Sequence, residues 1–264
     1  MIKKKYIYNY KIISIVLFLF LIIWQLIALY FDKPKIFPGI IYLIKISFPS
    51  FSNFSDNNIN PYLSSVNILF SNSIITFIRI LVSLVVGILC GISWGLLIHY
   101  FGSTKKINSY LLTIIKNIPL FALIPLFIYW FGGKIIGIYI YITFGIFTII
   151  ATNTYHAVFN VQPSLISQGK LMGADKNFIF RKIIFYNIQP ELLASIRNIV
   201  GLTWAFSLGA EYISANNGLG YLLYQSYLYA DMGKLIIIAF LYSIYGIISL
   251  IIFNKISGYI LRWH

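Results

Sequence analysis

Long runs of apolar residues recur along the chain and are separated by shorter polar segments. A run of about 20 such residues crosses a hydrocarbon core of about 30 Å as a helix, so each run predicts a membrane span. The six runs cover residues 12–31, 73–98, 110–131, 135–156, 192–213 and 235–253. The first follows a lysine-rich segment and precedes no small-residue cleavage site, so we interpret it as a retained anchor and not as a signal peptide.

Three longer segments connect these spans. Residues 32–72 contain four prolines that interrupt helices and a polar tract at 52–60, and we expect an external connection there. Residues 157–190 form a long cytoplasmic loop, and residues 214–233 form an external segment with a short interfacial helix after Gly218-Leu219-Gly220. We find no internal repeat and no second domain. The sequence therefore predicts one membrane domain over residues 1–264, all-α and polytopic, with six transmembrane helices.

Lysine and arginine are distributed unequally between the two sides that six spans define. If the N-terminus is cytoplasmic, twelve of these residues lie in inside segments and five in outside segments. The inside residues are Lys3, Lys4, Lys5, Lys11, Lys105, Lys106, Lys170, Lys176, Arg181, Lys182, Lys255 and Arg262. The outside residues are Lys33, Lys35, Lys45, Lys134 and Lys234. This bias indicates that both termini are cytoplasmic.

Composition narrows the function class further. Of the 264 residues, 59% are hydrophobic and 10% are charged, whereas a soluble domain has about 25% charged residues. An ordinary soluble enzyme, a disordered chain and a soluble nucleic-acid binder are therefore excluded. The net charge of +14 follows mainly from the loop asymmetry, so we expect membrane lipid and no nucleic acid as a partner.

The sequence contains no pattern for catalysis, nucleotide binding or metal binding. It lacks a Walker A loop, an H-E-x-x-H pair and a C-x-x-C pair. Cys90 lies in the middle of span two, and His99 and His156 lie near the predicted cytoplasmic edge of the membrane. This favours a packing cysteine and two interfacial imidazoles over a catalytic set. We expect no catalytic residue, no metal ligand and no cofactor in this chain.

Glycines and prolines in spans two and three predict close packing and a kink. Gly87, Gly91 and Gly95 recur at every fourth residue, which places them on one helical face where another backbone can approach. General glycine enrichment in membrane helices is the alternative explanation. Pro119 and Pro125 in span three predict a kinked helix beside a cavity, because proline frees backbone carbonyls that need new partners.

Span five carries a stripe of polar, aromatic and small residues. The stripe consists of Arg197, Gly201, Trp204, Leu208 and Glu211. Charged residues in a span usually face the bundle interior or an aqueous cavity, so Arg197, Trp204 and Glu211 are candidates for the wall of a translocation path, together with Arg79 of span two. The alternative is that the three charged side chains extend to the membrane surfaces. Arg197 and Glu211 lie about 21 Å apart along the helix and cannot pair with each other.

The cytoplasmic loop is the most unusual stretch of the chain. Residues 165–184 are amphipathic, basic and free of proline, and Gly173 interrupts them before Ala174 and Asp175. This pattern predicts a helix, a corner at Gly173 and a second helix that runs to Pro190. A loop of this length either lies on the membrane surface or docks on a cytosolic partner.

This loop resembles the one in the membrane subunits of bacterial ABC importers, whose hallmark is E-A-A-x-x-x-G, nine residues, then I-x-L-P. Gly173 and Ile183 stand at the glycine and the isoleucine of this hallmark, whereas Ser167-Gln168-Gly169 replaces E-A-A and Phe185-Tyr186 replaces L-P. Other segments are similar to the nitrate/sulfonate/taurine-type permeases. These are Phe37-Pro38, residues 117–126 around Pro119 and Pro125, Trp130-Phe131-Gly132, Ala210-Glu211 and residues 218–222. The resemblance extends over about residues 20–255 in one order.

The resemblance implies a type I ABC importer permease fold in a bacterial cytoplasmic membrane. It also implies a dimer with a second copy, two ATP-binding subunits that hold ATP and Mg, and an extracytoplasmic solute-binding protein. The corner at Gly173 would be the coupling helix that enters a groove of the ATPase. Its contact residues would be Lys170, Leu171, Met172, Gly173, Ala174 and Asp175. This chain itself would not be an enzyme, and its solute would be a small anion such as a sulfonate or nitrate, or a vitamin precursor.

Three other classes of membrane protein stay open at this point. A secondary transporter or channel needs no ATPase and is compatible with six spans and charges in the bundle, although the long cytoplasmic loop and the lack of an inverted repeat disfavour it. An intramembrane enzyme would need a cluster of catalytic groups. A scaffold-like component of a larger assembly is compatible with the loss of E-A-A.

Overall fold

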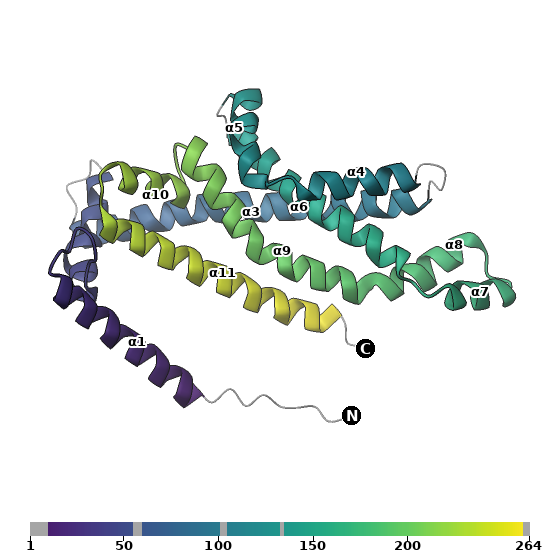
Figure 1. Cartoon of the computed structure of the whole chain (residues 1–264), viewed down its shortest axis with the longest axis horizontal. Helices are drawn as coiled ribbons and strands as arrows, with labels where there is room; N and C mark the ends of the chain where they lie inside the picture. Colours follow the sequence, from purple (N-terminus) through teal and green to yellow (C-terminus); the bar gives the residue numbers. More distant parts are fainter. Residues whose placement is uncertain (1–9, 55–59, 101–104, 133–134, 261–264) are drawn as a thin grey trace. The chain divides into compact units, whose positions relative to one another are not determined.

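The computed structural model describes residues 10–54, 60–100, 105–132 and 135–260, and every regular element within these ranges is helical (Figure 1). The elements are α1 (Tyr10–Phe31), α2 (Ile40–Tyr42), the helical turns η1 (Leu43–Ser47) and η2 (Pro49–Phe54), α3 (Pro61–Tyr100), α4 (Lys105–Asn117), α5 (Leu120–Phe131), α6 (Ile135–Phe159), α7 (Pro163–Leu171), α8 (Lys176–Phe178), the helical turn η4 (Ile179–Ile184), α9 (Phe185–Ser214), α10 (Leu219–Leu228) and α11 (Met232–Ile260). The predicted all-α fold is confirmed.

Five of the six apolar runs lie in single helices that are long enough to cross a membrane, and the sixth lies in a bent pair of helices. Among the described residues, α1, α3, α6, the continuous run Lys176–Ser214 and α11 are each long and apolar enough to cross a membrane. The count reaches six if the pair α4 and α5 is one broken span: residues Tyr110–Asn117 and Leu120–Phe131 meet the same criterion together but are bent by 91°, as in a broken span or a re-entrant loop. The short interfacial helix expected after Gly218-Leu219-Gly220 has its counterpart in α10.

The prediction of one kinked helix for span three is wrong, because two separate helices meet there at an angle of 91°. Pro119 has an extended backbone (φ −60°, ψ 111°) and precedes the first residue of α5. Proline has no amide hydrogen and disfavours a helical conformation at the residue before it, which ends α4 at Asn117. Pro125 lies inside α5 without ending it.

Two helices extend further than the sequence suggests. The helix that contains the predicted span 73–98 begins at Pro61, because proline fits the first turn of a helix and the Oδ1 of Asn60 accepts a hydrogen bond from the amide of Tyr62 at 3.0 Å. The helix after Gly173 does not end at Pro190 but continues to Ser214. Burial of Ile188 and Leu192 on either side of Pro190 offsets the single backbone bond that this proline removes.

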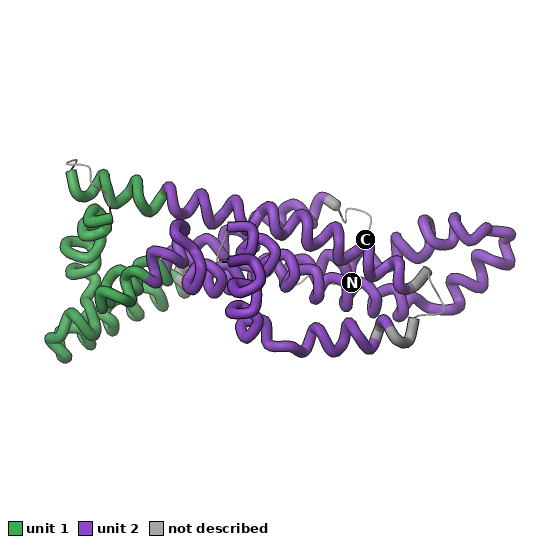
Figure 2. Tube along the Cα trace, turned by 90° about the horizontal axis from the view of Figure 1, so that it is seen from above, with its two compact units in different colours: residues 1–70, 225–239 green, residues 71–224, 240–264 purple. Residues whose placement is uncertain are grey.

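The described chain separates into two compact units, which Figure 2 colours differently. Unit 1 contains residues 1–70 and 225–239, and unit 2 contains residues 71–224 and 240–264. In unit 1, the indole nitrogen of Trp24 donates to the carbonyl of Pro38 at 3.0 Å. The buried ammonium of Lys234 lies 3.4 Å from Asp231 and 4.8 Å from the ring centre of Phe54, which stabilises its charge.

The core of unit 2 lies among α5, α6 and α9. Ile142, Ile146 and Ile150 of α6 are fully buried there, together with Ile199 of α9. Because one face of α6 is almost entirely apolar and covered by protein, this helix forms the centre of the unit.

The three glycines of α3 lie against α6. A methyl group at Gly87 would lie 2.7 Å from Cβ of Ile146, one at Gly91 would lie 2.8 Å from Cβ of Ile150, and one at Gly95 would lie 2.6 Å from Cβ of Thr154. Real Cβ contacts are longer than this, so the two helices approach as closely as they do because these positions have no side chain.

Candidate functional site

The corner between α7 and α8 is fixed by backbone hydrogen bonds. Gly173 has a φ of +79°, and its amide donates to the carbonyl of Lys170 at 3.0 Å. The amide of Ala174 donates to the carbonyl of Gly169, also at 3.0 Å. These two bonds form a Schellman motif, which needs a left-handed residue after the helix and explains the glycine.

Asp175 begins the next helix directly after this motif. Its Oδ1 accepts a hydrogen bond from the amide of Phe178 at 2.9 Å, which is the N-cap interaction typical of aspartate. A helix end and a helix start thus follow each other with no flexible residue between them. Hydrogen bonds thus define the backbone on both sides of the corner, and Figure 1 shows α7 and α8 side by side as a hairpin at the start of the run to α9.

The tip of this hairpin presents apolar side chains to the surroundings. Leu171 and Met172 are each 88% exposed, and Lys170 and Asp175 beside them are exposed as well. Below the tip, α7 and the following helix enclose a groove of about 680 Å³. Leu165, Gln168, Gly169, Met172, Gly173, Ala174, Asp175, Phe178 and Ile183 line this groove. Such an exposed apolar surface is typical of a binding site for another protein.

The segment that replaces E-A-A has a packing role of its own. Gly169 is buried, and a methyl group there would lie 2.6 Å from Cδ1 of Ile183. The isoleucine therefore packs directly onto the backbone of α7. Below it, Val158, Ile179 and Ile184 form a buried cluster that joins the hairpin to the end of α6. Apolar packing holds the two arms of the hairpin together.

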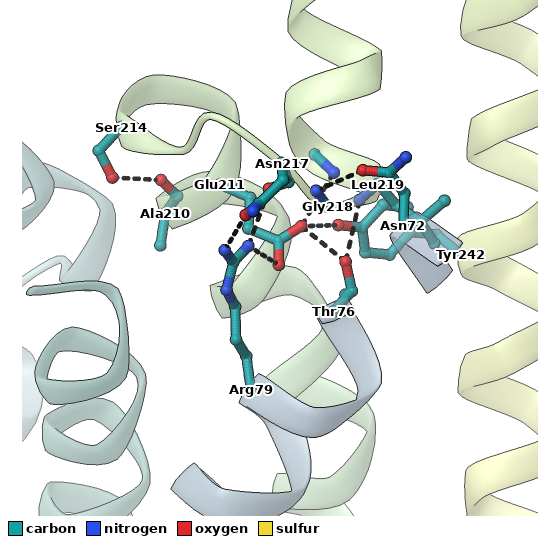
Figure 3. A network of polar contacts seen from close by, with 11 residues as sticks. Asn72, Thr76, Arg79, Ala210, Glu211, Ser214, Asn217, Gly218, Leu219 and Tyr242 are labelled. Carbon is teal, nitrogen blue, oxygen red and sulfur yellow. Dashed lines mark hydrogen bonds and ion pairs between the residues drawn. The ribbon is translucent and has the colours of Figure 1, made fainter. Parts of the chain in front are cut away.

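A second site surrounds the carboxylate of Glu211 near the end of α9, shown in Figure 3. Glu211 is completely buried and Arg79 of α3 is 2% exposed. Nη1 of Arg79 lies 2.8 Å from Oε1 of Glu211 and donates to the carbonyl of Asn217 at 2.9 Å. Nη2 of Arg79 donates to Oδ1 of Asn217. The two buried charges neutralise each other within hydrogen-bond distance.

The other carboxylate oxygen of Glu211 accepts three more hydrogen bonds. The donors to Oε2 are the hydroxyl of Thr76 at 2.8 Å, the amide of Gly220 at 3.0 Å and the hydroxyl of Tyr242 at 3.3 Å. Thr76 in turn accepts from the amide of Leu219 at 2.9 Å. These contacts connect α3, the end of α9, the start of α10 and α11. We call Asn72, Thr76, Arg79, Glu211, Asn217 and Tyr242 the Glu211 hub.

Glycine is required on both sides of Leu219. Gly218 has a φ of +102° and a methyl group there would lie 2.6 Å from Oε2 of Glu211, while one at Gly220 would lie 2.5 Å from Cβ of Glu211. The amide of Gly218 also donates to Oδ1 of Asn72 at 2.7 Å. The Gly-Leu-Gly segment therefore lies directly on the carboxylate, and its three amides all bond to side chains of α3 and α9.

The structure brings together three of the four residues predicted for a path. Arg79 and Glu211 pair, and Trp204 stacks with Tyr245 at 5.8 Å and meets Tyr242 edge to face. Arg197 is exposed and lies apart from them on α9. The alternative that Arg79 and Glu211 extend to the membrane surfaces is wrong, because protein covers both. Their assignment to a translocation path stays a prediction.

Sequence reasoning missed the polar partners of Glu211. Asn72 lies outside the apolar run that predicts span two. Thr76, Asn217 and Tyr242 are uncharged, and only charged and aromatic residues of spans two and five were candidates for the path. The spacing of Ala210-Glu211 and Gly218-Leu219-Gly220 was the available signal, since it suggests a carboxylate beside a tight backbone segment. Among the described residues, no group of three or more His, Cys, Asp or Glu side chains has the arrangement of a metal site.

Comparison with known proteins identifies the family. Residues 83–263 match the family model of the binding-protein-dependent transport system inner membrane component. The chain belongs to this family. It is a non-enzymatic permease subunit of an ABC importer, and ATP hydrolysis takes place in separate subunits.

Individual relatives agree with this membership. The permease is 28% identical over 229 residues to a putative ABC transporter permease of Methanocaldococcus jannaschii, which covers 86% of this chain and 82% of that protein. It is 28% identical to the putative aliphatic sulfonates permease SsuC of Escherichia coli over 57% of each chain. It is 24% identical to the formylaminopyrimidine permease ThiX of Halalkalibacterium halodurans over 92% of each chain.

The fold agrees with that of solved permeases. The MetNI methionine ABC transporter in an inward-facing conformation superposes with a TM-score of 0.63 at 21% identity, covering 72% of this chain and 95% of that chain. The type I ABC importer permease fold implied by the sequence motifs is thereby confirmed.

Proposed function

We propose that the permease is driven through the corner at residues 170–175, which docks in a groove of a partner ATPase. The observation that carries this proposal is the pair of side chains at the tip, Leu171 and Met172, which are almost completely exposed on a corner of fixed shape. Large apolar side chains gain free energy when a partner removes them from water. A preformed corner also avoids the entropy cost of ordering a loop on binding.

The corner is joined to a continuous helical run that transmits its movement. Lys176–Ser214 contains 39 residues, which corresponds to about 58 Å at 1.5 Å per residue. When Mg-ATP draws two ATPase subunits together, each corner moves with its ATPase and displaces this helix. The π-helical turn η4 lies between the corner and α9 and allows a local change of register there.

The proposed assembly contains two copies of this permease, two ATP-binding subunits and one external solute-binding protein. Each copy contributes one membrane domain over residues 1–264 with both termini in the cytoplasm of a bacterium. The bias of lysine and arginine toward the predicted inside segments supports this orientation. Lys3, Lys4, Lys5, Lys134 and Arg262, which contribute to the count, lie outside the described residues, and the structure describes no side-chain position for Lys11, Lys105 and Lys106.

The proposed solute is a small organic anion of the sulfonate type or a pyrimidine vitamin precursor. SsuC and ThiX support these two classes by their names and by their similarity to this permease. Arg79, Arg197, Trp204 and Glu211 stay our candidates for the path. Arg197 is the one of these four whose side chain is exposed on this chain, which supports a contact with an anion.

Co-purification with the ATPase tests the corner. Gly173→Arg puts a side chain on a left-handed residue and breaks the Schellman motif, so we expect the ATPase to be lost from the purified complex and transport to stop. Gly258→Arg is the matched control, since it adds the same charge at an exposed glycine of α11 with open space around it. Unchanged assembly and transport in Gly173→Arg would contradict the proposal.

Thermal-shift screening of the purified solute-binding protein tests the solute. We expect stabilisation by an alkanesulfonate or by an aminopyrimidine, and none by an amino acid. Stabilisation by an amino acid alone would refute both proposed solute classes, while leaving the role of the corner untouched.

A further inference from the structure

The Glu211 hub and the corner at residues 170–175, which we call the coupling corner, lie at opposite ends of one helical run. Lys176 follows the corner directly, and Glu211 is three residues before the last residue of the run, Ser214. The about 52 Å between them along the helix axis exceeds the hydrocarbon core of about 30 Å. A displacement that begins at the corner therefore reaches the hub on the other side of the membrane.

Four directional bonds to Glu211 make the hub an all-or-none contact. They come from Thr76 and Arg79 on α3, from the amide of Gly220 and from Tyr242 on α11. Hydrogen bonds weaken steeply with distance and angle, so a shift of α9 by even part of a turn breaks several of them together. Contacts of this kind have discrete made and broken states.

The segment between α9 and α10 depends on this contact for its position. Ala215 to Gly218 has no regular structure, and the following amides bond to side chains. The amide of Gly218 bonds to Asn72, that of Leu219 to Thr76 and that of Gly220 to Glu211. Arg79 holds both the carbonyl and the side chain of Asn217. If Glu211 withdraws, the segment loses its direct bond to the carboxylate and the charge that keeps Arg79 in place.

A buried ion pair is not the expected choice where stability alone matters. Well-packed apolar residues of the same volume serve as well or better, because the desolvation of two charges offsets most of their attraction. The best-attested use of such a pair is to specify one arrangement among several. Arg79 and Glu211, both covered by protein, specify the register of α9 against α3.

We propose that the Glu211 hub is the outer latch of the transport cycle. Glu211 is the positioning residue that holds residues 215–220 on α3, and movement of the coupling corner, carried along Lys176–Ser214, pulls its carboxylate away and frees this segment. The proposal rests on the proposed function, because it takes the corner as the point where the movement begins. The latch links the side that meets the ATPase to the side that receives the solute.

A disulfide across the latch tests whether it must open. The amide nitrogen of Leu219 lies 2.9 Å from Oγ1 of Thr76, so the two residues are direct neighbours across the latch and are the pair chosen for cross-linking. Thr76→Cys with Leu219→Cys is made in a Cys90→Ser background and assembled with the ATPase and the binding protein in nanodiscs. After oxidation with diamide, we expect ATP hydrolysis stimulated by the binding protein to fall about tenfold or more, and to recover in dithiothreitol.

The controls separate the latch from the proposed function. The Cys90→Ser complex and the two single-cysteine variants receive the same oxidation, and we expect it to leave the rate of each variant at the value that the same variant has before oxidation. If the cross-link forms and the double-cysteine variant still hydrolyses ATP at the stimulated rate that it has in dithiothreitol, the latch is refuted. If the wild-type permease binds no ATPase, the proposed function fails instead.

Neutral variants test the opposite change, a latch that no longer holds. Glu211→Gln keeps the shape and one acceptor oxygen, and we expect ATP hydrolysis without binding protein to rise about tenfold. If Glu211→Gln does not fold, the double variant Arg79→Gln/Glu211→Gln replaces it. The double variant leaves no unpaired charge, so we expect it to fold and to assemble with the ATPase. Lys255→Gln, which removes an exposed charge on α11, is the control. Wild-type rates and stimulation in the folded double variant would overturn the latch.

Discussion

The contact between α3 and α6 can be tested by adding a side chain at Gly95. A methyl group there would lie 2.6 Å from Cβ of Thr154 and 2.8 Å from the carbonyl oxygen of Ala151. Neither atom can move away by rotation of a flexible side chain, because one is bonded directly to the backbone and the other belongs to it. Gly95→Val therefore forces the two helices apart.

Overpacking a close-packed core lowers the free energy of unfolding by about 1–3 kcal/mol. Because the added side chain meets two atoms of α6, we expect a loss near the upper end of this range. Helix propensity does not offset much of this, since valine is among the weaker helix formers. The midpoint of thermal unfolding falls by about 2–4 °C for each kcal/mol in a chain of about 150–250 residues, so we expect a decrease of about 6–12 °C.

The assay is thermal unfolding of the purified permease in detergent, and the measured quantity is the fraction of protein that remains monodisperse at each temperature. Gly258→Val is the matched control, because Gly258 lies in a helix as well and no heavy atom lies within 4 Å of a methyl group built there. We expect its midpoint to stay near that of the wild type. Equal midpoints for Gly95→Val and the wild type, or an equal loss in both variants, would refute the packing argument.

Three further predictions concern the corner and the aromatic cluster. Gly173→Val costs about 1–2 kcal/mol at a left-handed residue and weakens co-purification of the ATPase, whereas Gly173→Asn, which tolerates this conformation, retains it. Leu171→Glu is expected to leave the midpoint of thermal unfolding unchanged, because the side chain is exposed. In a titration with the ATPase it is expected to reduce the affinity at least about tenfold, and an affinity equal to that of the wild type would show that the tip is not the contact. Trp204→Phe removes the hydrogen bond from Nε1 to Oγ of Ser249 and is expected to lower the free energy of unfolding by about 1 kcal/mol. Melting curves of this variant and of Trp130→Phe, which changes an exposed tryptophan, test this expectation.

Much of the fold could be predicted from the chain because the membrane imposes a strong constraint. Each span needs enough apolar residues to cross the bilayer, and this requirement is visible as a run in the sequence. The corner was also predictable, since Gly173 followed by Asp175 is a local pattern for the end of one helix and the start of the next. These features depend on neighbouring residues and on the solvent only.

The errors share a cause, which is that proline acts through its surroundings. Pro61 starts a helix, Pro119 breaks a span by 91°, and Pro125 and Pro190 lie within helices. The missing amide is the same in each case, but its cost depends on whether neighbouring packing holds the helix together. No pattern in the sequence contains that information.

The apolar runs, the corner at Gly173 and the family can all be recognised in the chain alone, because each follows from residues close together in the chain or from motifs in a common order. The role of the charges, in contrast, depends on how the helices pack. Arg79 and Glu211 are 132 residues apart in the sequence, and each alone was compatible with a translocation path or with the membrane surface. Their pairing, and the polar residues that complete it, follow from the packing of α3 against α9. An isolated charge in a span must find a partner, and only the fold determines which one it meets.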